Sequence, residues 1–333
     1  MPKPRIAVLT TGGTIVSVAS SALEMNNYGQ LAGFTSLSSQ DLLASIPGIE
    51  AHADITVFPV TDIGSARMGF DAWIKIVRCI EDLDRRDSAD GFVITHGTDT
   101  LEETAYFLSL VLKTEKPVVL TGAMRPSTGL SADGPMNLAG AICLAASSEA
   151  RAMGVLVLMN DTISSAFSVQ KTNTTNVATF RNPGLGFLGF MQDCKPFFFT
   201  RPLKAQTKKT PFFIDDFIPF PRVDVNFCTL GSDGKLIEAM VACGTQGIVN
   251  AGVGHANMSV SVREALAHAA REGIPVVLTS RVASGIVTPV EKFAPYGFVA
   301  GYMHTPQKAR ILLAAALTKT NERARIQETF ETY

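Results

Sequence analysis

Short, uninterrupted apolar runs that alternate with segments of helical periodicity constrain the fold of this chain most strongly. In the N-terminal half the runs begin at Ile6, Ile55, Gly91, Pro117 and Gly154. Continuous apolar runs are typical of strands that are buried on both faces. Between them, apolar residues recur with a spacing of about 3.6 residues, over 70–86, 101–113 and 134–150. The order βαβαβ predicts a mostly parallel sheet covered by helices.

A second α/β series follows a break in composition. From Asp193 onward the chain is rich in proline and phenylalanine and has no sustained period, which is typical of an interdomain connection. Apolar runs then resume at Val223, Gly247, Pro275 and Tyr296, with helical segments over 260–273 and 305–320. We therefore expect two α/β domains, a larger N-terminal catalytic domain over 1–200 and a smaller C-terminal domain over 223–333, joined by a linker over 201–222.

The composition excludes several classes of partner. The net charge is -1, which gives no electrostatic reason to expect nucleic acid or an anionic membrane as partner. No apolar stretch approaches the roughly 18 residues of a membrane span. Five scattered cysteines form no CxxC pair, so we expect reduced thiols and a cytoplasmic protein. A periplasmic location is the alternative, because a leader removed from a precursor leaves no trace in the mature sequence.

The loops that follow the predicted strands are rich in threonine, glycine and acid. "TTGGT" spans 10–14, "THGTDT" spans 95–100, and "TGAMRPS" begins at Thr121. Ligands of parallel α/β sheets bind beyond the carboxyl ends of the strands. The first loop lacks the GxGxxG pattern, and no loop ends in Gly-Lys-Ser/Thr, so both nucleotide interpretations are weak. GxSxG, HExxH and Cys/His metal spacings are also missing, which argues against serine-triad and zinc catalysis.

Threonine chemistry fits these loops better. A hydroxyl becomes a nucleophile when a base removes its proton and N–H donors stabilise the oxyanion. Gly12 and Gly13 can expose Thr14, and Thr98 beside Asp99 offers a second hydroxyl. Lys171 can accept its proton if burial and a nearby charge lower the pKa of the amine. By contrast, we expect His96 to be a hydrogen-bonded structural residue.

Several stretches taken together resemble one family. "TGGTI", "HGTDTLEETAYFL", "TGAMRPST", "SADGPMNL" and "KTNTTNVATF" are similar to the signature stretches of the bacterial type II L-asparaginase and glutaminase-asparaginase family. The resemblance continues through "AGVGHANMS", "SRVASG" and "TPQKAR", and so covers nearly the whole chain. It implies an amidohydrolase that converts asparagine, with glutamine as a second candidate, without a metal or an organic cofactor.

The resemblance also implies roles for individual residues. Thr14 corresponds to the nucleophile that forms an acyl-enzyme, and Tyr28 to the loop tyrosine that helps to activate it. Thr98, Asp99 and Lys171 match the second triad, in which Thr98 also contributes to the oxyanion site. Together these five positions form the catalytic set that we expect.

Substrate binding is implied at further positions. Ser65 and Asp99 match residues that hold the α-carboxylate and the α-amino group, and Ala123 matches a backbone contact. Asn257 and Glu291 match residues that reach the site of a neighbouring subunit. The family is typically a homotetramer, so the resemblance implies shared active sites.

One departure bears on specificity. The family usually has Gln or Glu after the serine of the "GS" turn, where it helps to bind the α-amino group, whereas this chain has Ala66. Loss of a polar partner costs about 1–3 kcal/mol. A glutaminase-leaning enzyme or an ω-amidase that accepts amides without an ammonium group is therefore the alternative within the family. Outside it, the alternatives are a non-catalytic small-ligand sensor and, without the resemblance, a nucleotide-binding protein.

Overall fold

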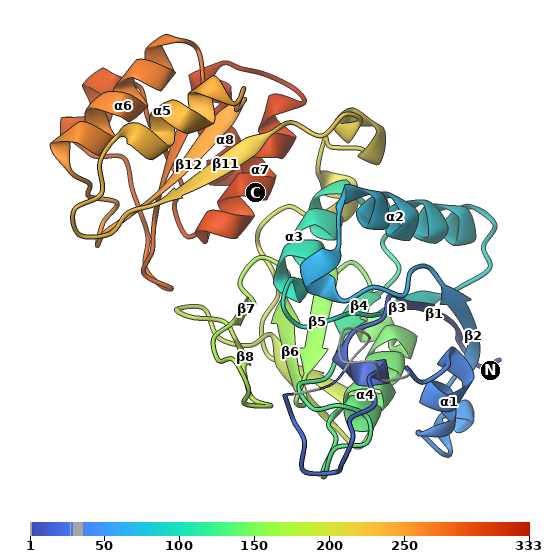
Figure 1. Ribbon diagram of the computed structural model, residues 1–333. Helices are drawn as coiled ribbons and strands as arrows, with labels where there is room; N and C mark the ends of the chain where they lie inside the picture. The colour runs from blue at the N-terminus through green and yellow to red at the C-terminus, as the bar shows by residue number, and fades with distance from the viewer. Residues whose placement is uncertain (1, 27, 29–35) are drawn as a thin grey trace. The chain divides into compact units, whose positions relative to one another are not determined.

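The computed structural model describes every residue except 1, 27 and 29–35, and it divides into two compact units, Met1–Pro211 and Phe212–Tyr333. Each unit contains its own sheet (Figure 1). The predicted class of two α/β domains, the first larger than the second, is confirmed. The division lies inside the stretch 201–222. Part of that stretch packs on unit 1, because Lys113 Nζ donates to Thr210 Oγ1 at 2.7 Å.

The sheet of unit 1 has eight strands in the order β10-β9-β6-β5-β4-β3-β1-β2. They are β1 (Arg5–Thr10), β2 (Asp54–Pro59), β3 (Gly91–Thr95), β4 (Val118–Thr121), β5 (Val155–Met159), β6 (Thr162–Ser165), β9 (Gly189–Gln192) and β10 (Lys195–Phe198). The strands from β2 to β5 are parallel, whereas β6, β9 and β10 extend the sheet in antiparallel fashion. A separate pair is formed by β7 (Gln170–Lys171) and β8 (Phe180–Arg181).

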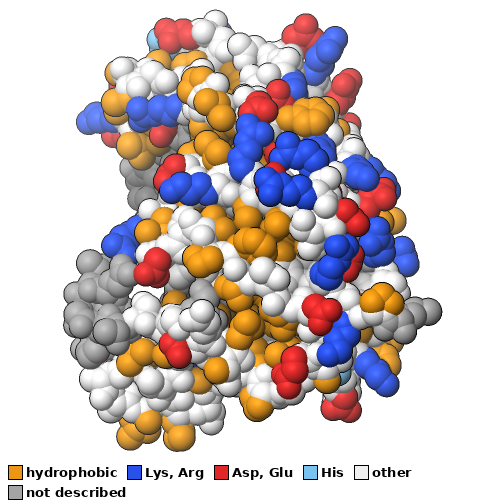
Figure 2. All heavy atoms as spheres, turned by 90° about the vertical axis from the view of Figure 1, so that its right-hand side faces the viewer, with side chains coloured by type: hydrophobic (Ala, Val, Ile, Leu, Met, Phe, Trp, Pro, Cys, Tyr) orange, Lys and Arg blue, Asp and Glu red, His pale blue; other side chains and the backbone are white. Residues whose placement is uncertain are grey.

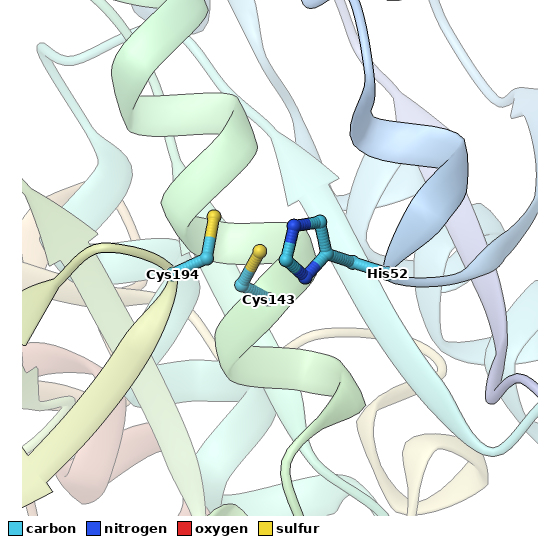
Figure 3. Close-up of side chains that lie close together, drawn as sticks. All are labelled: His52, Cys143 and Cys194. Atoms are coloured by element: carbon cyan, nitrogen blue, oxygen red, sulfur yellow. The ribbon is translucent and has the colours of Figure 1, made fainter.

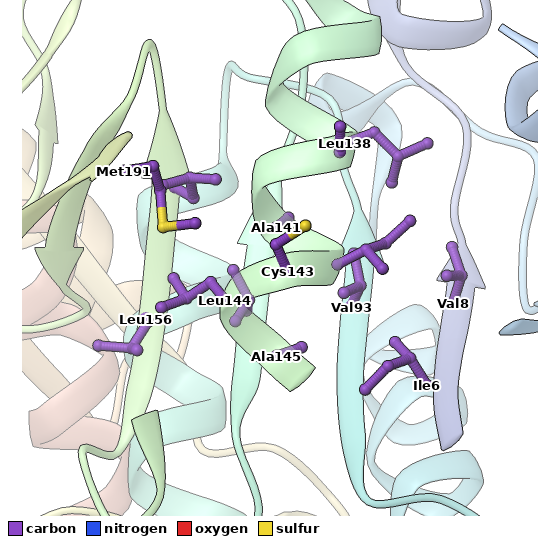
Figure 4. Close-up of a cluster of buried hydrophobic side chains, with 14 of the residues drawn as sticks. Ile6, Val8, Val93, Leu138, Ala141, Cys143, Leu144, Ala145, Leu156 and Met191 are labelled. Atoms are coloured by element: carbon purple, nitrogen blue, oxygen red, sulfur yellow. The ribbon is translucent and has the colours of Figure 1, made fainter. Parts of the chain in front are cut away.

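Helices cover both faces of this sheet (Figure 1). They are α1 (Ser39–Ala44), α2 (Phe70–Arg85), α3 (Leu101–Val111) and α4 (Gly134–Ala146). α4 packs on one face, where Leu138 and Leu144 meet Val8 of β1 and Val93 of β3 (Figure 4). α2 and α3 lie on the other face and meet through the stacked rings of Trp73 and Phe107. α4 is apolar nearly all round because it is buried nearly all round.

Unit 2 has a four-stranded parallel sheet in the order β11-β12-β13-β14. Its elements are β11 (Val223–Phe227), α5 (Lys235–Ala242), β12 (Gly247–Gly252), α6 (Val260–Arg271), β13 (Val276–Ser280), β14 (Val299–Ala300), α7 (Pro306–Leu317) and α8 (Arg323–Thr332). α5 and α6 cover one face, and α7 and α8 cover the other (Figure 1).

Some elements differ from the sequence expectation. The run that begins at Tyr296 is a strand only over β14, because Tyr296 ends a 3-10 helix and Gly297 then adopts a left-handed conformation with φ 74°. Phe197 and Phe198, expected in connecting structure, lie on the edge strand β10. The antiparallel strands β6, β9 and β10 and the helices α1, α5 and α8 were not predicted.

The described part of the chain contains no helix that is both long and apolar enough to cross a bilayer. On the face in Figure 2, Lys and Arg side chains lie among Asp and Glu side chains. The mixture agrees with the nearly neutral net charge.

Candidate active site

The ends of three neighbouring strands bring the threonine-rich loops together. Thr10 at the end of β1 pairs with Pro59 of β2 and with Thr95 of β3. Because these strands are parallel and in register, the loops that follow them leave the sheet at the same edge. The loop at 11–14 is tied down on both sides, since Thr11 Oγ1 donates to Thr95 O at 2.8 Å and Ile63 N donates to Thr11 O at 3.1 Å.

Two glycines allow the first loop to approach the others. Gly12 and Gly13 have φ of 98° and 96°, a region that L side chains rarely adopt. A Cβ on Gly13 would lie 2.6 Å from both N and Cα of Gly97. A Cβ on Gly97 would in turn lie 2.6 Å from Ser65 Oγ. The twin glycines of the sequence are therefore required by close contact between loops.

Thr14 begins a short 3-10 helix directly after this turn. Its side chain is partly exposed, whereas Ile15 and Val16, which follow it, are buried and anchor the turn. Thr14 Oγ1 and Tyr28 Oη are 3.2 Å apart, and either oxygen can be the donor. The structure thus places the expected nucleophile beside the expected tyrosine.

The second predicted group also comes together. Lys171, on β7, donates from Nζ to Thr98 Oγ1 at 2.9 Å and to Asp99 Oδ1 at 2.7 Å. Thr98 is buried, Asp99 is exposed, and the Lys171 side chain is mostly buried. A lysine amine in contact with a buried hydroxyl can exchange a proton with it, and the carboxylate sets the charge around the pair.

Ser65 connects this group to the loop after β2. The Ser65 side chain is buried, and its Oγ accepts a hydrogen bond from Asp99 N at 3.2 Å. The Ser65 carbonyl accepts one from Thr100 Oγ1 at 3.0 Å. These two bonds hold the serine expected to bind an α-carboxylate directly beside the loop at 96–100.

Glu102 is a residue that the sequence analysis missed. It lies in the first turn of α3, is buried, and its Oε2 accepts a hydrogen bond from the backbone N of Lys171 at 2.7 Å. It therefore fixes the position of the lysine that contacts Thr98. From the sequence it reads as an ordinary acid in the first turn of a helix, where carboxylates are common.

These loops enclose a cavity of about 570 Å³. Among the predicted residues, its lining includes Thr14, Tyr28, Ser65, Thr98, Asp99 and Lys171. Ala66 and Met124 also line it. Ala123, the expected backbone contact, is fully buried next to Met124, and its side chain is not part of the lining.

Asn257 and Glu291 lie in unit 2 and are both exposed there. Asn257 follows β12 and its side-chain oxygen accepts a hydrogen bond from Lys292 Nζ. Glu291 begins the 3-10 helix that contains Lys292. The two expected residues are therefore neighbours within unit 2.

His96 is structural, as expected. It is fully buried, with Nδ1 2.7 Å from Gly97 O and Nε2 2.9 Å from Thr104 Oγ1. Burial lowers its pKa to about 4. A neutral imidazole with both nitrogens occupied supports the loop that carries Thr98.

Comparison with known proteins identifies one family along the whole chain. Residues 5–204 match the family description "Asparaginase, N-terminal", and residues 222–330 match "Glutaminase/Asparaginase C-terminal domain". The L-asparaginase 2 of Escherichia coli K12 is 42% identical over 99% of this chain and 93% of its own length. The glutaminase-asparaginase of Acinetobacter glutaminasificans is 37% identical over 99% of this chain and 100% of its own length.

A solved structure of similar fold points to the same family. The crystal structure of a probable cytoplasmic L-asparaginase from Campylobacter jejuni superposes with a TM-score of 0.95, at 41% identity, over 99% of this chain and all of that one. Two family descriptions that follow one another along the chain, and similarity over its full length, show that this chain belongs to the asparaginase family.

Proposed function

We propose that this chain is an L-asparaginase-like amidohydrolase, which converts asparagine to aspartate and ammonia through an acyl-enzyme on Thr14. One observation carries the proposal: the Thr14 hydroxyl and the Lys171–Thr98 pair line the same cavity. Relatives with full-length similarity are named L-asparaginase or glutaminase-asparaginase, which supports the same substrate class.

The first half-reaction starts at Thr14. Its Oγ1 attacks the carbon of the side-chain amide while its proton passes to Tyr28 Oη, which lies within hydrogen-bond distance, and the tyrosine passes its own proton on to the amide nitrogen. The resulting oxyanion requires positioned donors, to which Thr98 contributes. The C–N bond breaks, the nitrogen takes up a proton, and ammonia leaves an ester on Thr14.

Water completes the second half-reaction. It attacks the ester carbon, gives its proton to the alkoxide that leaves, and releases aspartate and free Thr14. Lys171 Nζ exchanges a proton with Thr98 Oγ1 during these steps, and Asp99 holds the Lys171 amine beside it.

The decisive experiment compares Thr14→Ala with the control Ser20→Ala. Ser20 also carries a hydroxyl, but it is exposed and does not line the cavity. Ammonia release from asparagine is expected to fall to background in Thr14→Ala and to stay unchanged in Ser20→Ala. Mass spectrometry after rapid acid quench is expected to detect an aspartyl ester on the Thr14 peptide of the wild type. Undiminished deamidation by Thr14→Ala would refute the mechanism. A wild type that binds aspartate yet releases no ammonia would identify a sensor instead.

Ala66 favours a second candidate function at the same site. Its methyl group lines the cavity where the resemblance places Gln or Glu, so one polar partner of the substrate ammonium group is missing. We propose reduced discrimination between asparagine and succinamic acid, which lacks that group. Kinetics on asparagine, glutamine and succinamic acid test this, and a strong preference for asparagine would argue against it. In Ala66→Gln the ratio of kcat/KM for asparagine to that for succinamic acid is expected to rise about 5–150-fold.

We further propose that Asn257 and Glu291 complete the site of a neighbouring subunit in a homotetramer. Their exposure in unit 2 and their proximity to one another support this role. Light scattering combined with activity measured over a dilution series tests it, since a fully active monomer would contradict it. The compartment stays a prediction: one similar protein is named cytoplasmic and another periplasmic.

A further inference from the structure

Two cysteines and a histidine that lie far apart in the sequence meet in unit 1, away from the active cavity. The ligand atoms of His52, Cys143 and Cys194 all lie within 4.8 Å of one another (Figure 3). They come from three segments: the turn before β2, the core face of α4, and the hairpin between β9 and β10. The three residues line a surface pocket that shares no lining residue with the active cavity.

The three side chains of the cluster differ in burial and in local backbone structure. Cys143 is buried among the core residues of α4, which fixes its position (Figure 4). Cys194 is the second residue of a two-residue turn in which Asp193 and Cys194 have φ of 49° and 58°. Glycine is usual at that second position. His52 is exposed at the end of a 3-10 helix, so its ring can adjust.

Two thiols and one imidazole form a typical zinc ligand set. Zn²⁺ binds sulfur at about 2.3 Å and imidazole nitrogen at about 2.0–2.1 Å, in tetrahedral geometry. Ligand atoms around such an ion are then about 3.5–3.8 Å apart. The three side chains thus need only small rotations to reach this arrangement.

The surroundings leave room for a fourth ligand. The three residues line a surface pocket of about 510 Å³. Glu149 and Lys195 line the same pocket, as does Pro4, which directly precedes β1. The pocket therefore lies at the amino-terminal edge of β1, whereas the active cavity lies beyond the carboxyl end of that strand.

We propose that His52, Cys143 and Cys194 bind one zinc ion or a similar soft divalent cation, with a fourth coordination position open to this pocket. A disulfide between Cys143 and Cys194 is the competing outcome, but it would leave the histidine without a role. Bound metal would connect three segments of unit 1 that are separated by roughly 50–90 residues in the sequence.

Binding must displace protons. Burial and the neighbouring Cys194 sulfur raise the pKa of the Cys143 thiol, so this thiol is protonated at neutral pH. Metal requires thiolates, and its apparent affinity therefore rises with pH.

The test is a Co²⁺ and Zn²⁺ titration of the untagged full-length protein, kept reduced. We expect one ion per chain and a thiolate-to-cobalt charge-transfer band with tetrahedral visible bands. Cys194→Gly suits the left-handed turn, and His52→Gln keeps a polar side chain at an exposed position. Outer-shell changes alone cost 10–100-fold in metal affinity, so loss of a direct ligand is expected to cost more than about 100-fold.

Cys243→Ser is the matched control, because Cys243 is an exposed thiol in unit 2 and should leave binding unchanged. Wild-type affinity in Cys194→Gly, or no charge-transfer band in the wild type, would overturn the proposal. So would an isolated protein in which Cys143 and Cys194 form a disulfide and the reduced form binds no metal.

Discussion

The active cavity and the His52–Cys143–Cys194 cluster are built in the same unit by different means. The cavity takes its residues from loops that follow strands in register, so short sequence stretches such as "HGTDT" already hold several of its members together. The cluster takes one residue from each of three distant segments, and no spacing in the sequence indicates it. A search for metal-ligand spacing finds only sites whose ligands are close along the chain.

The two regions also differ in how firmly they are fixed. Around the cavity, Thr98, Asp99 and Ser65 are connected by hydrogen bonds to one another or to Lys171. In the cluster, Cys143 belongs to the packed core and Cys194 packs against it, whereas His52 is exposed. We infer that the cavity is preorganised for chemistry, whereas in the cluster the exposed ring of His52 is the ligand that has to adjust when an ion binds.

The largest effect is expected from Lys171→Met, which removes the amine that contacts Thr98. Acid–base groups contribute about 10²–10⁴-fold to rate, so we expect kcat for asparagine to fall by about 10³-fold with little change in melting temperature. Lys209→Met is the matched control, because Lys209 is exposed and remote in sequence from the loops of the cavity. A fall of less than tenfold would show that the pair on the cavity wall is not catalytic.

Gly13→Ala is expected to come next. Its Cβ would lie 2.6 Å from backbone atoms of Gly97, so the loops must separate, and displacement of catalytic groups by 1 Å can cost about 10²-fold in rate. Gly186→Ala is the control: Gly186 also has positive φ, but its Cβ would meet open space. That variant is expected to lose about 1–2 kcal/mol of stability and no activity. Equal activity losses in both variants would refute the contact argument.

A pH effect on stability is expected from His96. Burial lowers its pKa in the folded state to about 4, below the ordinary value of 6.5. Between these two pH values the unfolded state takes up the proton first, so the stabilising contribution is complete above pH 6.5 and is lost as pH falls to about 4. The loss is about 3 kcal/mol at most.

Urea unfolding at several pH values, together with NMR titration of the His96 ring, measures this contribution. The ring is expected to remain neutral down to about pH 4. A ring that titrates near pH 6.5 would show that the region behind the cavity is open to water, which would argue against a firmly packed cavity.

Glu102→Gln is expected to have a smaller effect. The amide still accepts the bond from Lys171 N but loses its charge, and a bond to a charged group exceeds a neutral one by about 1 kcal/mol. We expect kcat to fall by up to about tenfold while KM changes little, with a shifted pH profile. Glu103→Gln, at the next position of α3, is the control. Identical behaviour of both variants would remove Glu102 from the site.

The smallest effect concerns the cluster. Cys194→Gly relieves a left-handed L residue, and the metal-free chain is expected to gain up to about 1 kcal/mol in the free energy of unfolding. Urea unfolding in the presence of a chelator measures it, with Cys243→Ser as the reference. A loss of stability would indicate that the thiol already makes a favourable contact without metal.

The sequence predicted the elements whose buried residues form a clear pattern along the chain. β1, β3 and β5 read as strands, and α2 and α3 as helices, because burial on known faces gives a clear period. The antiparallel strands β9 and β10 have only four residues each and are partly exposed, so their pattern is weak. The domain limits at 200 and 223 and the roles of the individual site residues stay predictions.

Within the site, the sequence predicted which residues line the cavity better than it predicted which residues hold them in position. Thr14, Tyr28, Thr98, Asp99 and Lys171 do line one cavity, as the resemblance implied. The role of Glu102 could not be recognised from the sequence. Its carboxylate accepts a hydrogen bond from the backbone N–H of Lys171 on β7, 69 residues later in the chain. A hydrogen bond to the backbone of a distant residue does not depend on that residue's side chain, so no sequence pattern predicts it.

The contact between Gly13 and Gly97 has a practical consequence for redesign. Since these two loops already touch without side chains, that wall can be neither lined with new groups nor pushed outward to admit bulkier amides. Room for a larger substrate has to come from lining side chains outside this contact, such as those of Ala66 and Tyr28. Variants with altered substrate range should therefore change these lining side chains and keep Gly13 and Gly97 as glycines.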